Sequence, residues 1–413
     1  MRKMKDSGLQ WAGDIPQYWN TAKGKYFMAV LERPVRDDDS VITCFRNGEV
    51  TLRSNRREDG FTVATVEAGY QGIEPGDLVV HGMDGFAGAI GISDSRGKGT
   101  PALNVLSCSE NKKYIMYLLR AMAYTEVFMA LSTGIRVRTC DTNWKKLKSL
   151  DYLIPPADEQ QCIADFLDGK CAEIDALAAD IQAQIDTLEQ YKRSIITETV
   201  TKGLNQNAEM KDSGIEWVEQ MPMSWNTVPN KYLMYKIKSI CPIYNGENIL
   251  SLTTNGVIIR DLNGGGKMPT SFDGYQKIVP GNLLMCLFDI DVTPRCIGLI
   301  KDFGLTSPAY SQFAMKDGAY APYYYYYYLM VDYTKELLHM AKNLRHSLTE
   351  DQLGAIKAPR PPYDEQIQIA EYLDNKCSEI NQVIADKNNQ LSTLDKYKKS
   401  LIFEYVTGKK EVI

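Results

Sequence analysis

Pro155-Pro156-Ala157-Asp158-Glu159-Gln160 opens the stretch that decides the fold of this 413-residue chain, because the stretch occurs twice. Adding 206 to each number leads to residues 361–366, which read Pro-Pro-Tyr-Asp-Glu-Gln. The same offset relates Leu167-Asp168 to Leu373-Asp374 without a gap. An internal repeat of this kind indicates a tandem duplication, and it is settled before any other feature of the chain.

Each copy predicts one long helix. A proline pair and early acidic residues suit a helix start, and apolar residues then follow a heptad. The expected seam contains Ile174, Leu177, Ile181, Gln184, Leu188, Tyr191 and Ile195 in the first copy, and Ile380, Val383, Lys387, Gln390, Leu394, Tyr397 and Leu401 in the second. Roughly 40 residues give a rod of about 60 Å. We expect the two helices to form an antiparallel coiled coil; the alternative is two amphipathic helices, each packed on its own domain.

The composition describes a globular chain of two or three domains, with 44% hydrophobic and 24% charged residues. The chain shows no apolar run of membrane-spanning length and no secretory signal at its start, which favours a cytoplasmic location. Nine cysteines without a C-x-x-C pair fit reduced thiols. Only His81, His339 and His346 occur, which argues against a histidine-based metal site or catalytic triad.

Charge is distributed unevenly along the chain. Residues 158–202 contain ten acidic and four basic side chains, a net charge of −6. Residues 21–150 contain eighteen basic and fifteen acidic side chains, a net of +3, and residues 227–356 contain twelve and eleven, a net of +1. The acidic excess therefore lies on the predicted helices, and the remaining segments are mildly basic, as a DNA-binding face requires.

A shorter motif is also duplicated at the same offset. Residues 4–20 begin with Met-Lys-Asp-Ser-Gly and include Trp11 and Trp19, and residues 210–226 repeat them with Trp217 and Trp225. We expect the tryptophans to anchor this segment against the domain that follows it.

The intervening segments of about 130 residues have diverged but keep common landmarks. Asn47-Gly48 corresponds to Asn255-Gly256, and each pair predicts a hairpin turn. Short β-rich runs between glycine and asparagine turns predict strand-rich domains, with helices over residues 114–129 and 323–340. The run of six tyrosines at 323–328 would surround its helix, so we expect some rings to be exposed or at an interface.

No nucleotide-binding P-loop is present. The candidate DNA-binding residues are instead those in and around the turns and glycine-rich loops, since Arg, Lys, Asn and Thr side chains hold phosphates and read base edges. They are Arg46, Arg53, Arg56, Arg57, Arg96, Lys98, Arg136 and Arg138 in the first copy, and Thr253, Thr254, Asn255, Arg260, Lys267, Arg295, Arg345 and His346 in the second. Any one of them could instead form an ordinary surface salt bridge.

The duplicated motifs resemble a known family, the specificity (S) subunits of type I restriction–modification enzymes. The resemblance rests on the Lys5-Asp6-Ser7-Gly8 motif with its tryptophans, on its copy from Lys211, and on the helices that begin at Pro155 and Pro361. It implies an α+β chain with target recognition domains at 1–154 and 206–360 and spacer helices at 155–205 and 361–413, which form an antiparallel coiled coil.

The resemblance also implies a function in phage defence. The chain would bind double-stranded DNA and assemble with two copies of the methylation subunit and with restriction subunits, and would itself have no catalytic residue. It would need no cofactor, because S-adenosylmethionine, ATP and Mg would be used by its partners. The bipartite layout predicts an asymmetric split DNA target. The alternative is a coiled-coil adaptor that presents two protein-binding domains.

Overall fold

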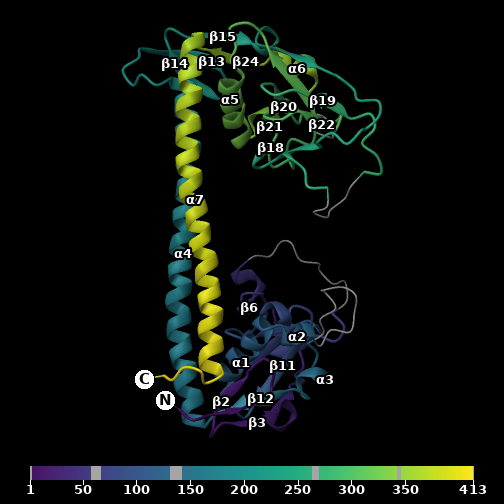
Figure 1. The fold of residues 1–413 in the computed structure, drawn as a ribbon, viewed down its shortest axis with the longest axis vertical. Coiled ribbons are helices and arrows are strands. Elements are labelled where there is room, and N and C mark those ends of the chain that lie inside the picture. Colours follow the sequence, from purple (N-terminus) through teal and green to yellow (C-terminus); the bar gives the residue numbers. More distant parts are fainter. Residues whose placement is uncertain (1, 57–66, 131–141, 263–268, 342–345, 413) are drawn as a thin grey trace. The chain divides into compact units, whose positions relative to one another are not determined.

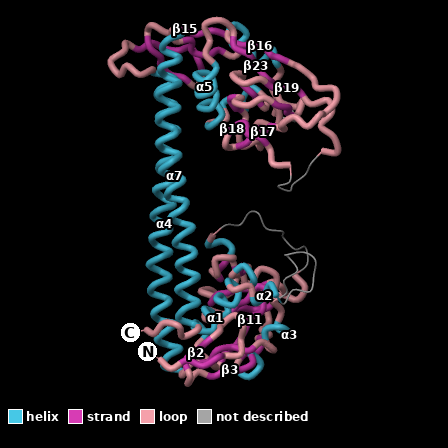
Figure 2. Tube along the Cα trace, viewed as in Figure 1, coloured by secondary structure: helices cyan, strands magenta, loops and turns pink. Residues whose placement is uncertain are grey.

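The structure is a computed structural model, and it describes residues 2–412 except 57–66, 131–141, 263–268 and 342–345. Contacts divide the chain into two compact units (Figure 1). Unit 1 comprises Met1–Ile181 and Asn388–Ile413, and unit 2 comprises Gln182–Lys387. Each unit contains one strand-rich segment and one part of each long helix (Figure 2).

The core of unit 1 is a four-stranded antiparallel sheet of order β4-β11-β8-β9 with α1 against it. Smaller two-stranded sheets pair β1 with β2, β3 with β12, β5 with β6 and β7 with β10. The strands are β1 Met4–Asp6, β2 Asp14–Pro16, β3 Asn20–Lys23, β4 Met28–Val30, β5 Ile42–Cys44, β6 Val50–Leu52, β7 Gln71–Ile73, β8 Leu78–His81, β9 Ile90–Ile92, β10 Gly97–Gly99, β11 Leu103–Cys108 and β12 Asp151–Ile154. The helices are η1 Gly24–Tyr26, η2 Arg53–Asn55, η3 Gly85–Ala87, α1 Lys112–Tyr124, α2 Val127–Ala130 and α3 Trp144–Leu147.

Unit 2 repeats this arrangement with a sheet of order β16-β23-β20-β21 against α5. Its smaller sheets pair β13 with β14, β15 with β24, β17 with β18 and β19 with β22. The strands are β13 Met210–Ile215, β14 Val218–Pro222, β15 Asn226–Pro229, β16 Met234–Ile237, β17 Leu250–Thr253, β18 Gly256–Ile259, β19 Gln276–Ile278, β20 Leu283–Met285, β21 Ile297–Leu299, β22 Gly304–Thr306, β23 Ser311–Met315 and β24 Lys357–Arg360. The helices are η5 Asn230–Tyr232, α5 Ala321–Tyr333, η6 Glu336–Met340 and α6 Glu350–Ala355.

The predicted fold class, two strand-rich segments in tandem with two long helices, is confirmed. The long helices are α4, Ala157–Lys202, and α7, Tyr363–Val406. Among the described residues, no helix combines the length and apolar character that a membrane span requires. The exact domain boundaries stay predictions, because the contacts divide the chain within α4 and α7.

The helices run antiparallel within each unit, as the repeat predicted. In unit 1 the Phe166 and Tyr405 rings lie 4.4 Å apart, and Lys398 Nζ donates to Asp175 Oδ2 at 2.6 Å. In unit 2 Lys192 Nζ donates to Asn381 Oδ1 at 3.0 Å, and Lys387 Nζ donates to Gln184 Oε1 at 2.5 Å. In each unit the α4 residue number rises as its α7 partner's number falls.

The seam positions that are spaced seven residues apart and include Ile174 and Ile181 were predicted correctly. The seam positions between them, such as Leu177, were placed one residue too early. Ile174, Ile181 and Ile195 are buried, but Leu177 and Tyr191 are 49% and 56% exposed. The residues that face the partner helix are those one position later, and among them Ile185 is buried. The second copy behaves alike, since Val383 and Tyr397 are also exposed. At 3.6 residues per turn, either neighbour of a heptad position can face the partner, and packing selects one.

The duplicated tryptophans do anchor the N-terminal motifs, as predicted. Trp19 and Trp225 are fully buried. Trp19 Nε1 donates to Glu159 Oε2 at 2.9 Å, and Trp225 Nε1 donates to Glu365 Oε2 at 2.9 Å. Each motif is therefore fastened to the first turn of the long helix of its own repeat.

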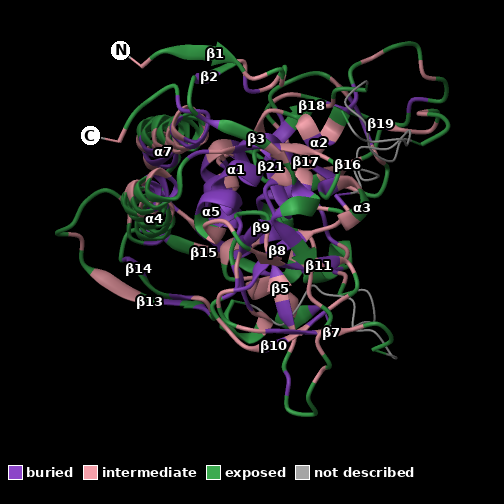
Figure 3. Ribbon diagram, turned by 90° about the horizontal axis from the view of Figure 1, so that it is seen from below, coloured by how far each residue is buried: buried purple, intermediate pink, exposed green. Residues whose placement is uncertain are grey.

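The tyrosine run lies on α5, and of the two expected places for its rings, the surface or an interface, the structure shows the interface, where α5 meets α4 and α7. Five of its six residues are buried, as Figure 3 shows for most of α5, and Tyr325 is half-buried. Tyr323 donates to the Val200 carbonyl at 2.9 Å, and Tyr326 donates to Asp374 Oδ1 at 2.6 Å. Because α5 is covered on several sides, each ring is buried while its hydroxyl finds a polar partner at the edge of the core.

Candidate nucleic-acid interface

In unit 1 the first group of candidate arginines lies on the β5–β6 hairpin. The strands pair Cys44 with Val50, and the connecting turn is closed by Gly48 N, which donates to the Phe45 carbonyl at 2.8 Å. Gly48 has φ +87°, a backbone conformation that favours glycine. The Asn47-Gly48 turn predicted from sequence is confirmed.

A buried arginine holds this turn in place, and sequence reasoning missed it. Arg120 on α1 donates from Nε to the Ile90 carbonyl at 2.8 Å and from Nη2 to the Gly48 carbonyl at 2.9 Å. Its only signal in the sequence was a charged residue inside the apolar stretch 114–129. Arg120 thus positions the hairpin without facing solvent itself.

The hairpin and its surroundings form a hollow of about 560 Å³. Its wall includes three predicted residues, Arg46, Arg53 and Arg56, together with the unpredicted His81 and Asp84; the other lining residues are Ile42, Thr43, Cys44, Phe45, Asn47, Thr100 and Leu103. Three arginines that line one hollow are suited to bind phosphate or the acceptor edge of guanine.

The ion pairs at this hollow are weak. Arg46 lies 2.9 Å from Asp84 with its side chain 63% exposed, and Arg56 lies 3.2 Å from Glu49 with its side chain 42% exposed. Exposed pairs contribute about 0–1 kcal/mol, so either guanidinium can exchange its carboxylate for a nucleic-acid group at small cost. Arg56 also lies over the Phe45 ring at 4.3 Å, which limits its orientations.

His81 adds a neutral donor to the same hollow. Burial lowers the pKa of His81 below its ordinary value. Its Nδ1 accepts from the backbone N–H groups of Met83 and Asp84 at 3.2 and 3.1 Å. In a neutral imidazole the other nitrogen then carries the proton, so Nε2 is a hydrogen-bond donor. Burial also raises the pKa of Cys44 to about 12, which keeps that wall of the hollow uncharged.

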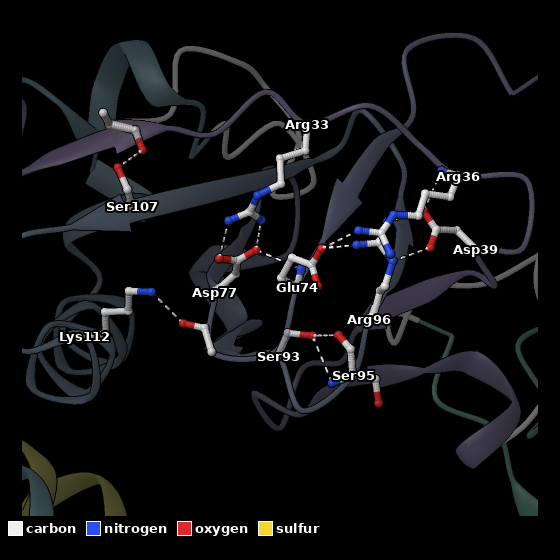
Figure 4. Close-up of polar contacts among 12 residues, drawn as sticks. Arg33, Arg36, Asp39, Glu74, Asp77, Ser93, Ser95, Arg96, Ser107 and Lys112 are labelled. Carbon is white, nitrogen blue, oxygen red and sulfur yellow. Dashed lines mark hydrogen bonds and ion pairs between the residues drawn. The ribbon is translucent and has the colours of Figure 1, made fainter.

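Arg96 and Lys98, also predicted, are paired more tightly. Arg96 lies between Asp39, at 3.0 Å, and Glu74, in the ion-pair network that Figure 4 shows. Lys98 lies 2.6 Å from Glu67. The Asp39 side chain is only 2% exposed, so removing Arg96 would take away the guanidinium partner of a buried carboxylate and leave it the Arg36 backbone N–H. This geometry favours a structural role for Arg96, and its DNA contact stays a prediction.

In unit 2 the β17–β18 hairpin takes the corresponding place. Thr253 pairs with Gly256, and Thr253 Oγ1 accepts from Asn255 N at 3.2 Å. Thr254 and Asn255 are exposed at the tip. Arg260 N donates to the Ile249 carbonyl at 2.7 Å, just as Arg53 N donates to the Val41 carbonyl at 2.8 Å in unit 1. Arg53 and Arg260, each just after the second strand of its hairpin, therefore hold matched places in the two units.

Both hairpins dock on their sheets through a glycine of the repeat. A Cβ on Gly298 would lie 2.6 Å from Val257 Cγ2 and 2.7 Å from Leu252 Cδ1. A Cβ on Gly91 would overlap the Gly48 carbonyl oxygen. The two units thus share one mechanism for fixing a hairpin but present different side chains on it.

Two further predicted residues, Arg295 and His346, lie away from the hairpin of unit 2. Arg295 comes two residues before β21, the strand against which β18 packs, and is half-buried. His346 has φ +41°, and its Nε2 lies 3.8 Å from Asp291 Oδ2. The structure therefore divides the unit 2 candidates between the hairpin and the segment that precedes β21.

The remaining predicted residues lie outside the described residues. They are Arg57, Arg136, Arg138, Lys267 and Arg345. Within the described part of the chain, no three His, Cys, Asp or Glu side chains gather in a way that could hold a metal ion.

Known proteins resemble the chain along nearly its full length, although no protein-family model matches it. A Methanocaldococcus jannaschii protein named as the MjaX specificity subunit of a type I restriction enzyme is 24% identical, over 96% of this chain and 95% of that protein. The MjaVIII specificity subunit of a type I restriction enzyme, from the same organism, is 25% identical over 73% of this chain and 72% of its own length.

The fold is also shared. A chain from a solved structure of a type I R-M system superposes with a TM-score of 0.69 at 12% identity, covering 96% of this chain and 99% of that one. The similarity in sequence and the common fold together confirm the resemblance of this chain to the specificity subunits of type I restriction–modification enzymes.

Proposed function

We propose that this chain is a cytoplasmic, non-catalytic DNA-binding specificity subunit that recognises a bipartite, asymmetric target. The observation that carries the proposal is the duplicated frame with two different hairpin surfaces. Arg53 and Arg260 hold matched places, whereas the tips carry Arg46-Asn47 in one unit and Thr254-Asn255 in the other. Different side chains on a common frame favour two readers of different half-sites.

The spacing between the half-sites would follow from the long helices. At 1.5 Å per residue, the 46 residues of α4 extend about 69 Å. Helix length rather than base contacts would then fix how many base pairs remain unread between the half-sites, as the separation of recognition elements does in dimeric DNA-binding proteins.

The helices also support docking of two copies of one partner, the methylation subunit. Tyr191 and Tyr397 occupy the same place in the two repeats and are both exposed. Each repeat also contains a matched ion pair on the helix surface, Lys170 with Glu173 and Lys376 with Glu379, both at 2.8 Å. A surface that is the same in both repeats cannot distinguish two half-sites, so it suits a partner that binds twice. Restriction subunits would join this assembly to cleave DNA.

Methylation-aware sequencing of DNA from cells that express the chain with its methylation subunit tests the proposal. We expect a split, asymmetric adenine-methylated motif that is absent without the chain, since the partner must extrude an adenine to modify it. Unchanged methylation despite formation of the partner complex would favour the adaptor function instead. A palindromic motif would contradict the asymmetric target.

Single substitutions test the assignment of the two hairpins. Arg53→Ala should relax the motif in one half-site only, and Arg260→Ala should relax it in the other. Loss of one good base contact costs about 1–3 kcal/mol, or roughly 5- to 150-fold in discrimination. If both variants altered the same half-site, or neither changed the motif, the hairpins would not be the readers.

A further inference from the structure

Unit 1 contains a second hollow beside the hairpin hollow, of about 730 Å³. Its lining includes two aromatic residues, Tyr70 and Trp144, the cations Arg33 and Lys145, and one carboxylate, Glu32. Leu103 lines both hollows, and Thr100 and Pro101 belong to one each. The segment 100–103 therefore borders both hollows.

Hydrogen bonds and an ion pair hold the wall of the second hollow in place. Asn104 on β11 accepts from Trp144 N at 3.1 Å and donates to the Thr142 carbonyl at 3.1 Å. Gln71 Nε2 donates to the Leu103 carbonyl at 2.7 Å. Arg33 is held by Asp77, with Nη2 3.1 Å from Oδ1 (Figure 4). The bonds of Asn104 fix the start of α3, and with it the Trp144 side of the hollow.

The segment that contains α3, at one side of this hollow, is basic. Residues 142–150 contain Lys145, Lys146 and Lys148 and no acidic residue. Lys145 and Lys148 are exposed. Lys25 also belongs to this surface, because its backbone N–H donates to the Lys148 carbonyl at 2.9 Å, and its side chain is exposed too.

The repeat shows that these lysines are not needed for folding. The 206-residue offset relates α3 to α6, and the buried Leu147 corresponds to the buried Leu353. Both helices are capped by a side chain, from Asn143 and Thr349. Yet residues 348–356 contain two acidic residues and no basic one. The same element thus tolerates either sign of charge, so the lysines of α3 require another explanation.

We propose that the surface formed by α3 and the Trp144 hollow binds the sugar–phosphate backbone of duplex DNA that flanks the half-site read by unit 1. This inference rests on the proposed function. Continuity with the arginine hollow selects DNA as the ligand, since a duplex seated on the hairpin would extend over the adjoining hollow. Lysines would neutralise phosphates there, and the aromatic residues would pack against sugars.

The test compares Lys145→Gln/Lys148→Gln with a control of equal charge change, Lys202→Gln/Lys396→Gln, whose exposed lysines lie on α4 and α7. Each full-length chain, in complex with its methylation subunit, is titrated by fluorescence anisotropy against target and random duplexes at several salt concentrations. For the α3 variant we expect the slope of log Kobs against log salt concentration to fall in magnitude by about 1.8, because each of the two lost phosphate contacts contributes about 0.9. The affinities for the target duplex and for the random duplex should fall by the same factor, because phosphate contacts do not depend on the base sequence. The control should retain the original slope.

Other outcomes would overturn the inference. An unchanged slope in the α3 variant would show that these lysines do not contact phosphate. Loss of the methylation subunit during purification, with DNA affinity per complex unchanged, would make the surface a protein-docking site. If the unsubstituted complex did not prefer target over random duplex, the proposed function itself would fail, whatever the lysines do.

Discussion

Gly91 is the residue on which the position of the unit 1 hairpin depends most directly. A Cβ at this position would overlap the Gly48 carbonyl oxygen and press on Val50, so the turn would have to move. We expect Gly91→Ala to destabilise the protein by about 1–3 kcal/mol, the usual cost of overpacking. Urea denaturation measures the effect, and target binding should weaken as the hairpin shifts.

Gly169 provides the control for that substitution. It lies within α4, and a Cβ there would meet nothing within 4 Å. Gly169→Ala should therefore stabilise the helix by about 0.5–1 kcal/mol, because alanine loses less conformational freedom on folding. A Gly91→Ala protein as stable as the unsubstituted chain would show that the hairpin is not packed against Gly91.

Asp39 should make stability depend on pH at the acidic end. Burial raises the pKa of Asp39, but the hydrogen bond from the Arg36 backbone and the pairing with Arg96 outweigh it, so the pKa lies below its ordinary value of 3.8. The pairing therefore stabilises the fold above pH 3.8, and this contribution is lost as pH falls from there through the folded-state pKa. Asp39→Asn should cost about 2 kcal/mol at pH 7, and the difference from the unsubstituted chain should shrink on acidification. Urea denaturation at several pH values measures this, with the exposed Asp38→Asn as control; a constant difference would contradict the assignment.

At the residue scale, the sequence showed which residue types occur near the hairpins, but it did not show whether each side chain is exposed or held in an ion pair. It predicted Arg46 and Arg96 alike as DNA-binding candidates, yet one is exposed beside a single carboxylate and the other is held between two. The deciding carboxylates Asp39 and Glu74 lie 57 and 22 residues from Arg96 in sequence. Such pairings depend on tertiary packing, which no local pattern shows. Arg120 was missed for the same reason, since its partners are backbone carbonyl groups 30 and 72 residues away in the sequence.

At the element scale, the heptad predicted both long helices and their antiparallel pairing, but only half of their seam. Hydrophobicity favoured Leu177, whereas packing buries the position one residue later, which in the next heptad is Ile185.

Alanine at Ile185, which is 7% exposed, should cost about 2–4 kcal/mol of stability. Alanine at Leu177, which is 49% exposed, should change stability by at most about 0.5 kcal/mol. Urea denaturation of both variants checks this, and equal losses would restore the seam expected from sequence.

The helix α5 shows a second limit of periodicity. Six consecutive tyrosines have no apolar face, so the pattern predicted only that some rings are exposed or lie at an interface. The structure instead satisfies the hydroxyl of Tyr324 with the Pro359 carbonyl at 3.1 Å and that of Tyr327 with Trp217 Nε1 at 3.0 Å. A tyrosine can be buried on any face of a helix whose neighbours supply a polar atom there. Whether they do is a property of the assembled unit and not of the run.

At the scale of the whole molecule, the duplication predicted the architecture because both copies had to satisfy the same packing. Tyr114 and Tyr323 illustrate this in the diverged segments, where the offset is 209 rather than 206. Tyr114 donates to the Val406 carbonyl at 3.2 Å and Tyr323 to the Val200 carbonyl at 2.9 Å, and these valines are themselves matched. The frame repeats even where the identity of the sequences has been lost, whereas Arg46 and Thr254 beside the shared Asn-Gly turns differ.

If helix length sets the unread spacer, lengthening both helices together should lengthen the target. One heptad inserted after Ala183 and another after Asn389 preserves the seam and adds about 10.5 Å, which is about three base pairs of duplex. Methylation-aware sequencing should then find the two half-sites unchanged and the gap between them longer by three. The same heptad inserted in α4 alone has no counterpart in α7, so it should disrupt their pairing and abolish methylation. A paired insertion that left the gap unchanged would show that something other than the helices sets the spacing. The proposal that the hairpins contact the bases while helix length sets the spacer would then be wrong.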